Sequence, residues 1–351
     1  MIGIFIILVV CFIVMTSFPF ILALRTPKDE QATLVVRSDN VKDPRYFPKA
    51  FKEILNKALE KGVFDEFLIL SRPEKFVYSE KVNDNVIHDL VICRDGFIAV
   101  GPARFEKEIY SENTVVLDEQ IEARAVSAQK LLLMNKCKIV RWCDGEKETY
   151  VGTGCDLGVS TTSDDYMQVM EDCVFHRLYA PQVDVMRCGD SKQIKREKRI
   201  VDSSILQELK NADETSCDVA AKDISIIYEN SNIKGNIITK DNLVIKEGAR
   251  ISGHIKSRKN ITIEKNVIID GNVFADGNVI IKSDVRVTGN VFSQSDVYVG
   301  YNSIIGQYGK IKSVIAKSHV FLCENITVFG YIGCDDKGYT LQKEKFLELL
   351  V

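Results

Sequence analysis

The sequence lacks most of the short motifs that mark enzymes and metal proteins. Its 351 residues contain no Gly-rich phosphate loop, no Ser-centred nucleophile elbow and no HExxH zinc motif. Ten cysteines are present, but none forms a CxxC pair, which argues against a zinc ribbon or a thioredoxin-type motif. We therefore expect no catalytic residue, no bound metal and no cofactor.

The chain is also poor in proline and has no excess of basic charge. Seven prolines and 21 glycines exclude collagen-like and proline-rich low-complexity chains. Lysine and arginine number 46 against 49 aspartates and glutamates, and a chain with a net charge of −3 has no global basic field for nucleic acid. Scattered unpaired cysteines suit a reducing compartment better than a secreted disulfide scaffold. The length predicts two or three folded units.

A long uncharged segment opens the chain. No charged residue occurs from Ile2 to Leu24, and a helix of that length spans roughly 34 Å, enough for a hydrocarbon core of about 30 Å. A cleaved signal peptide is the alternative, but no basic residue precedes the apolar run, as such a peptide requires. Arg25 and Lys28 follow the run and favour leaving the rest of the chain in the cytoplasm. We expect residues 1–24 to be a single-pass transmembrane anchor.

The next segment, residues 25–110, is predicted to be a small mixed α/β unit. Apolar residues recur at helical spacing over 47–61, which predicts an amphipathic helix. Short β-rich runs follow, and Arg94-Asp95-Gly96 is expected to form a hairpin turn between two of them. No chemistry is expected in this unit.

The second half of the chain is built from hexads that repeat in groups of three. The first and fifth positions of the hexads are mostly Ile, Val or a small residue, as expected of short strands that alternate inward and outward. The fourth position is almost always Asn, Asp or Gly. These residues tolerate left-handed backbone and predict a corner after every short strand. Three corners per period predict a triangular parallel β-helix over 225–334. The anchors of the repeat are four glycines, one per period: Gly235, Gly253, Gly271 and Gly289.

The same period recurs more weakly upstream. Val115, Leu133, Val151 and Val169 are separated by the same interval as the four glycines. Two solenoid lobes are therefore expected, at 111–188 and 225–334, and the fold class is mainly β. A column of three cysteines with the same spacing is interpreted as structural packing rather than as a metal ladder. These are Cys137, Cys155 and Cys173.

A charged segment, residues 189–224, separates the two predicted lobes. Such a run is usually a solvated linker, but beside a membrane it is also a candidate contact for anionic lipid. Its basic cluster comprises Lys192, Lys195, Arg196, Lys198 and Arg199.

A phrase in the second lobe resembles a known family. Gly-x-[Ile/Val]-x-[Ala/Ser/Thr] occurs once per period from Gly235 to Ser293 and resembles the bactofilins, a polymer-forming bacterial cytoskeletal family. The resemblance covers about 225–334. It implies a right-handed β-helix that assembles end to end without a nucleotide, as a cell-shape scaffold at the bacterial inner membrane. The implied partners are the chain itself or a related bactofilin, and it is left open whether cell-wall enzymes bind as well.

The ends of a solenoid are its natural assembly points, because strand edges and apolar core are uncovered there. We expect residues 335–351 to form a capping helix or tail over the last coil, with Thr340 as the helix N-cap. The expected assembly contact is then the N-terminal end of the second lobe, at Ile226, Ile227 and Tyr228.

Two other functions stay open from the sequence. A hexapeptide-repeat acyltransferase needs a histidine between neighbouring coils, and the candidates are His254 and His319. His254 stands in a column of asparagines and is expected to replace one of them, and no excursion loop is expected near His319 to build an acyl-donor pocket. An exported β-helical adhesin or carbohydrate-binding protein would require export, which the flanking charges and the unpaired cysteines disfavour.

Overall fold

The computed structural model describes residues 43–61, 67–70, 74–77, 86–187 and 226–350. The predicted anchor, Ile2–Leu24, and the basic cluster between the lobes lie outside these residues. Residues from Pro44 onward form one compact unit. Within the described ranges, no helix is both long enough and apolar enough to cross a bilayer.

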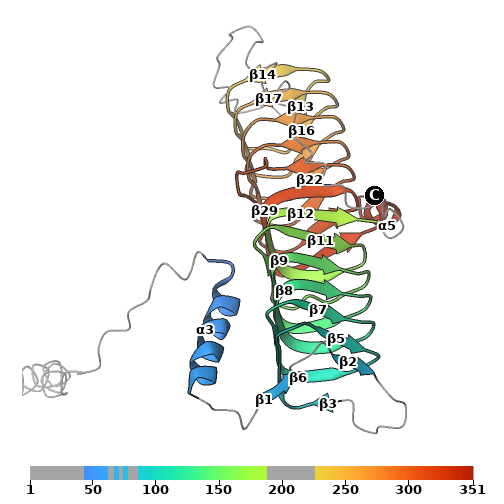
Figure 1. The fold of residues 1–351 in the computed structure, drawn as a ribbon. Coiled ribbons are helices and arrows are strands. Elements are labelled where there is room, and N and C mark those ends of the chain that lie inside the picture. The colour runs from blue at the N-terminus through green and yellow to red at the C-terminus, as the bar shows by residue number, and fades with distance from the viewer. Residues whose placement is uncertain (1–42, 62–66, 71–73, 78–85, 188–225, 351) are drawn as a thin grey trace, which may run out of the picture. The chain divides into compact units, whose positions relative to one another are not determined.

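The first part of this unit is one helix followed by a parallel stack of strands (Figure 1). Val91 of one strand pairs with Ile109 of the next coil, and Leu133 pairs with Val151 in the same way. The elements are α3 (Tyr46–Glu60), β1 (Phe67–Leu70), β2 (Glu74–Val77), β3 (Val86–Ile87), β4 (Leu90–Cys93), β5 (Phe97–Val100), β6 (Arg104–Ser111), β7 (Thr114–Leu117), β8 (Glu122–Leu133), β9 (Lys138–Val151), β10 (Ser160–Ser163), β11 (Tyr166–Met170) and β12 (Val174–Met186).

The second part is a more regular parallel stack with three short strands per coil. Ile251 pairs with Ile233 of the coil before it and with Ile269 of the coil after it, so equivalent positions recur once per three hexads. The strands are β13 (Ile226–Ile227), β14 (Asn232–Lys234), β15 (Ile237–Thr239), β16 (Leu243–Ile245), β17 (Arg250–Ser252), β18 (Ile255–Ser257), β19 (Ile261–Ile263), β20 (Ile268–Ile269), β21 (Val273–Ala275), β22 (Val279–Ile281), β23 (Arg286–Val287), β24 (Val291–Ser293), β25 (Val297–Val299), β26 (Ile304–Ile305), β27 (Lys312–Ala316), β28 (Val320–Cys323) and β29 (Ile326–Leu341), followed by α5 (Lys343–Glu348).

A single hydrophobic core runs through both stacks. In most strands of the second lobe the first and third residues are buried and the middle residue faces outward, as the hexad pattern predicts. One inward column consists of small residues that are fully buried. The interior of the solenoid is therefore narrow along this column. Ser257 and Ser293 in this column donate hydrogen bonds of 2.7 Å to backbone carbonyls at Asp241 and Gly277, which satisfies their buried hydroxyls.

The predicted separate α/β unit at 25–110 is wrong. β4 pairs in parallel with β1 and β6, and β5 pairs in parallel with β2 and β7, so these strands are coils of the first solenoid. The expected hairpin at Arg94-Asp95-Gly96 is a corner, because β4 and β5 pair with neighbouring coils and not with each other. Short β-rich runs joined by turns look the same in either arrangement, and only the pairing distinguishes them. The expected helix is present as α3.

The corners differ from the predicted pattern. At the fourth hexad position between residues 236 and 302, positive φ occurs once per coil rather than after every strand. Gly248, Asn266, Asp284 and Asn302 have φ between 57° and 73°. Each short strand ends at a turn, as predicted, but the left-handed backbone expected there occurs in one hexad in three. Side-chain hydrogen bonds explain the other two asparagine columns, as described below.

The period slips in one coil because the chain makes an excursion there. Ser293 pairs with Ala275 of the coil before it, but with Ala316 of the coil after it, which is farther away along the chain. The extra residues form a turn between β26 and β27, with Gln307 and Lys310 bridged in antiparallel fashion. Tyr308 at this turn is 59% exposed. The sequence-based expectation of no excursion in this region is corrected accordingly.

Candidate assembly interface

The two lobes meet through an antiparallel pair of strands, β12 and β29. The register runs from Val174 opposite Tyr339 to Val185 opposite Ile326. All other pairs between the described strands are parallel, so the lobes run in opposite directions and join at their C-terminal ends. No sequence pattern indicated this junction.

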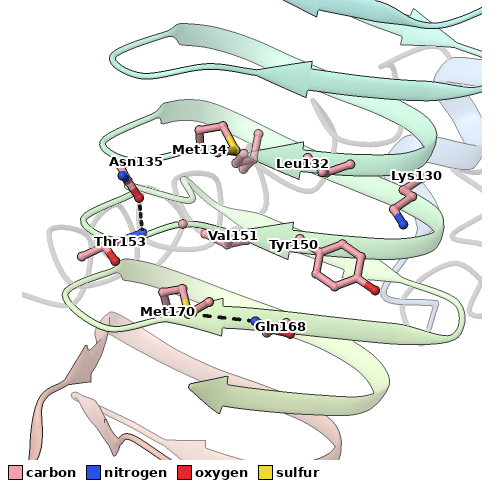
Figure 2. A pocket seen from close by; sticks show the side chains of 11 residues that line it. Lys130, Leu132, Met134, Asn135, Tyr150, Val151, Thr153, Gln168 and Met170 are labelled. Carbon is pink, nitrogen blue, oxygen red and sulfur yellow. Dashed lines mark hydrogen bonds between the residues drawn. The ribbon is translucent and has the colours of Figure 1, made fainter. Parts of the chain in front are cut away.

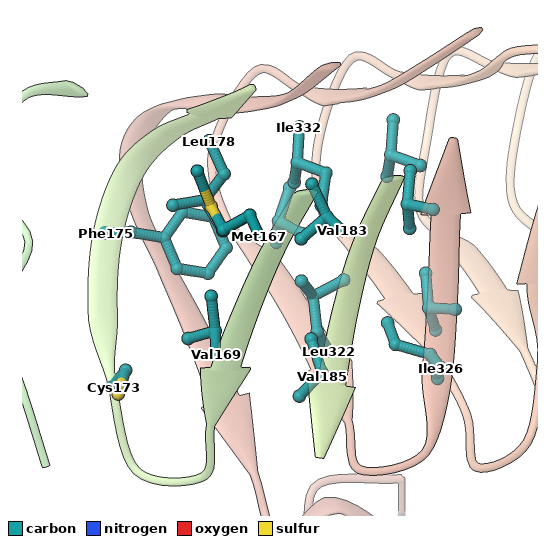
Figure 3. Close-up of a cluster of buried hydrophobic side chains, with 14 of the residues drawn as sticks. Met167, Val169, Cys173, Phe175, Leu178, Val183, Val185, Leu322, Ile326 and Ile332 are labelled. Atoms are coloured by element: carbon teal, nitrogen blue, oxygen red, sulfur yellow. The ribbon is translucent and has the colours of Figure 1, made fainter. Parts of the chain in front are cut away.

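The junction continues the hydrophobic core without a break. Side chains of β11 and β12 lie directly against those of β28 and β29 (Figure 3). Phe175, Val183, Leu322 and Ile332 are each 0% exposed. An apolar contact of this kind is the inside of a protein and not a separable surface, because exposing it costs about 25 cal/mol for each Å² of apolar area.

Polar contacts fix the register of the junction. The Thr340 hydroxyl donates to the Met170 carbonyl at 2.7 Å and accepts from the Cys173 N–H at 2.9 Å. Lys345 of α5 pairs with Asp172 at 2.7 Å. The C-terminal end of the second lobe is therefore closed by the first lobe.

The predicted capping role of the C-terminal tail is corrected by this arrangement. Thr340 lies inside β29, and the N-cap residue of α5 is Gln342, which makes no side-chain capping bond. Phe346 of α5 is buried, whereas Leu347 is 52% exposed. The tail lies beside β28, and the first lobe covers the last coil. A pairing between distant segments leaves no local signal in the sequence, which explains the error.

The opposite end of the second lobe begins at the predicted contact. β13, β14 and β15 each pair on one side only among the described strands, with β16, β17 and β18. Ile226 is 45% exposed, Tyr228 is 75% exposed and Ile238 of the same coil is 52% exposed. Ile227 is buried and pairs with Ile245, so its side chain belongs to the core.

The four repeat glycines form a column where successive coils touch. A Cβ built on Gly253 would press against the carbonyl oxygen of Gly235, and one on Gly271 would press against that of Gly253. Gly289 is crowded by Gly271 in the same way. Only glycine lets the backbones approach so closely, which gives the repeat its anchor.

Two ladders of side-chain hydrogen bonds join the coils at the other corners. In the first ladder, the His254 N–H donates to Asn236 Oδ1 at 2.8 Å, and the Asn272 N–H donates to His254 Nδ1 at 3.0 Å. In the second, Asn260 Oδ1 accepts from the Asn278 N–H at 2.8 Å, and Asp296 Oδ1 accepts from the His319 N–H at 3.0 Å. The asparagine columns thus provide acceptors for backbone N–H groups one coil away.

Both histidines considered for acyl transfer are members of these ladders. His254 uses Nδ1 as an acceptor, which requires that nitrogen to be unprotonated. His319 Nδ1 lies 3.1 Å from Asp296 Oδ1, and its ring stacks on Phe321 with centroids 5.9 Å apart. Their contacts are those of corner residues, and this supports reading His254 as an asparagine substitute.

Helix α3 is held on the flank of the first lobe by a buried ion pair. Arg45 donates to Asp144 through Nε at 2.8 Å and through Nη2 at 2.6 Å, and it also pairs with Asp164. Thr162 donates to the same Asp144 carboxylate at 2.5 Å. Burial raises the pKa of Asp144, and the hydrogen bonds from Arg45 and Thr162 oppose that rise. Burial lowers the pKa of Arg45, but its two carboxylate partners outweigh burial and raise it overall.

The cysteine column of the first lobe has a structural explanation. The cysteine column is buried, and the thiols of Cys155 and Cys173 donate to backbone carbonyls of the preceding coil. In the described part of the chain, no cluster of three His, Cys, Asp or Glu residues is placed to hold a metal ion.

An open groove of about 400 Å³ lies across β8, β9 and β11 of the first lobe (Figure 2). Its one lysine, Lys130, pairs with Glu148 at 3.1 Å and lies 4.9 Å from the ring centroid of Tyr150.

Comparison with known proteins identifies part of the second lobe. No curated protein and no solved structure matched the chain. Residues 219–307 match the Bactofilin family model, whose description is polymer-forming cytoskeletal. The match ends before β27 and does not reach the first lobe, and it overlaps the segment whose repeat resembled this family. The second lobe of this chain therefore carries a bactofilin domain.

Proposed function

We propose that this chain is a membrane-tethered scaffold of the bactofilin type, which associates through the N-terminal end of its second lobe. The partner is a second copy of the chain or the end of a related bactofilin. The proposal assigns no catalytic step to the protein. It places the chain at a bacterial inner membrane, with its bulk on the cytoplasmic side.

The observation that carries this proposal is the different state of the two ends of the bactofilin lobe. Its C-terminal end is paired with β12 along most of β29. Its first coil, β13–β15, is paired on one side only among the described strands and displays Ile226, Tyr228 and Ile238. An end with free strand edges and apolar side chains favours pairing with another such end. The chain therefore adds to a bactofilin assembly through one end of this lobe.

This mode of association needs packing and backbone hydrogen bonds alone. Contacts made by apolar side chains are not mainly ionic, so moderate salt leaves them in place. Removal of nucleotides or of divalent metal ions should have no effect. Assembly in EDTA is the simplest distinction from nucleotide-driven filaments.

Sedimentation of the full chain in detergent micelles tests self-association. The wild type should form species larger than one chain, without nucleotide and with EDTA present. Tyr228→Lys should give a folded but smaller species, because burying an ammonium at a contact is costly. Leu347→Lys is the matched control, since Leu347 is exposed but lies on α5. Ile227→Lys is unsuitable because it tests the core rather than the contact.

A monomer across a wide concentration range would exclude self-association. The chain would then be an adaptor for a related filament, which co-sedimentation with bactofilin polymers would reveal. If Tyr228→Lys and Leu347→Lys reduce the assembly equally, the contact lies elsewhere.

Tethering rests on the uncharged run Ile2–Leu24 followed by Arg25 and Lys28. Protease added to intact spheroplasts should leave the chain whole. Digestion from outside would reverse the orientation and favour the exported adhesin. This experiment is independent of the sedimentation test.

A further inference from the structure

Helix α3 presents an apolar edge that its packing on the first lobe does not use. Ile54 is 67% exposed, Phe47 is 54% exposed and the neighbouring Tyr46 is 39% exposed. Two large side chains so open on one helix are unusual for a helix already docked on a protein. This edge consists of Phe47, Ala50, Ile54 and Ala58, and we refer to it as the outer edge of α3.

The docked face of α3 is a different set of residues. Leu55 is buried and packs in a cluster with Leu90, Ile92 and Tyr110 of the solenoid. Phe51 lies between the two faces and contacts Trp142, with ring centroids 5.5 Å apart. The apolar arc of the helix is therefore wider than the surface it covers.

Lysines lie beside the outer edge at helical spacing. Lys57 lies one helical turn after Ile54 and Lys61 lies two turns after it, so both are on the same side of the helix. Lys57 pairs with Glu53 at 2.6 Å, and both of these side chains are well exposed. Lysines that flank an apolar strip can extend their ammonium groups to lipid headgroups while the strip enters the interface.

We infer that the outer edge of α3 contacts the surface of a lipid bilayer and turns this flank of the first lobe toward the membrane. The inference rests on the proposed tether. Residues 25–45 cannot extend beyond about 75 Å, so an anchor at Ile2–Leu24 keeps α3 within that distance of the bilayer. Because the anchor already holds the chain at the membrane, the effective concentration of lipid near α3 is high. An apolar strip that is too small to bind a free protein to a membrane is then large enough to keep α3 on the bilayer surface. The contact specifies an orientation: α3 faces lipid, and the second lobe's open end is left for assembly.

Lipid quenching of a tryptophan probe tests this contact in the full chain. Trp142→Phe removes the single native tryptophan and keeps a ring against Phe51. In this background Ile54→Trp places the probe on the outer edge, and Leu347→Trp is the matched control on α5. Both chains are reconstituted into vesicles of phosphatidylcholine and phosphatidylglycerol that contain brominated lipid.

The Ile54→Trp emission should be shifted to the blue and quenched at least twofold by brominated lipid, and the Leu347→Trp emission should change little. Adding Phe47→Ser should reduce the quenching of Ile54→Trp. Equal quenching of both probes, or none of Ile54→Trp, would overturn the inference. A probe protected from acrylamide but not reached by brominated lipid would show that a protein covers this edge, and the inference would again be wrong.

Alkaline extraction of the same vesicles separates this inference from the tether itself. A chain that resists extraction but gives no lipid quenching keeps its anchor and lacks the α3 contact. A chain released by extraction has no membrane-spanning anchor, and the proposed tether fails with it.

Discussion

Thr327 Oγ1 donates a hydrogen bond of 2.6 Å to Asp184 Oδ1, between segments far apart in the sequence and across the boundary between the lobes. The other carboxylate oxygen of Asp184 accepts from Tyr166 at 3.1 Å and from Gln182 at 2.8 Å. Burial raises the pKa of Tyr166, and the nearby Asp184 carboxylate raises it further, so the phenol remains a donor. This cluster joins the last coil of one lobe to the last coil of the other.

The junction bond should contribute measurably to stability. Thr327→Val removes the donor from a buried side chain, and we expect a loss of about 1–2 kcal/mol in the free energy of unfolding. Urea denaturation provides the measurement. Thr288→Val is the matched control, since Thr288 makes a 2.7 Å bond to Asp270 within the second lobe alone.

Thr327→Val should keep a single unfolding transition, because the hydrophobic core is continuous across the junction. An unfolding free energy that is unchanged in that variant would show that this bond adds nothing to the strand pairing and packing of the junction. A double-mutant cycle with Asp184→Asn measures the coupling between the two side chains.

The inward and outward positions of one strand should respond oppositely to charge. Val279 is fully buried in the core, and Ile280 is the outward residue of the same strand. Val279→Asp should unfold the second lobe, because an unpaired carboxylate in an apolar core costs several kcal/mol. Ile280→Asp should leave the circular dichroism spectrum and the melting temperature nearly unchanged. Similar melting temperatures of the two variants would contradict the inward position of Val279 and the outward position of Ile280.

The ladder position of His254 should accept asparagine but not leucine. Asn already performs the same acceptor role at Asn236 and Asn272, so His254→Asn should fold with wild-type stability. His254→Leu leaves the Asn272 N–H without its side-chain acceptor and should cost about 1 kcal/mol. Thermal melts of both variants measure this difference. A loss of function in His254→Asn with an intact fold would instead favour the acyltransferase.

Breaking the buried ion pair should release α3 from the first lobe. Arg45→Ala leaves the buried Asp144 carboxylate without its main partner, and removing one member of such a pair costs about 3–5 kcal/mol. Trp142 is buried and contacts Phe51 of the helix, so its emission should shift to the red. Lys57→Ala removes an exposed pair on the same helix and should leave the emission unchanged. An unshifted spectrum in Arg45→Ala would mean that apolar packing alone holds α3.

The coil period and its anchors were readable from the sequence because they are local and repeated. A solenoid places identical demands on every coil, so inward aliphatics, crowded glycines and corner asparagines recur at one fixed interval. Gly253 and Gly271 illustrate this, since each is required by the carbonyl of the glycine one coil before it. The helix at Tyr46–Glu60 was also readable, from the helical spacing of its apolar residues.

The use made of the corner residues needed the structure. Asn266 adopts positive φ, while Asn272 in the next hexad provides a hydrogen-bond acceptor, and both are written as Asn in the sequence. The strands before residue 110 were misassigned for a related reason. Short apolar runs between turns fit hairpins and parallel coils equally well until their partners are known.

The order of the amino acids was enough to predict stacked parallel coils of three hexads each and a bactofilin-like repeat. The two lobes were also expected from the sequence, but the junction that joins them at their C-terminal ends emerged from the three-dimensional arrangement alone. β12 and β29 are distant segments, each suited to pair with its own lobe, so their antiparallel contact leaves no periodic trace. The same contact pairs the C-terminal end of the second lobe within the core, so in the described part of this lobe it is the first coil, β13–β15, that keeps an unpaired strand edge.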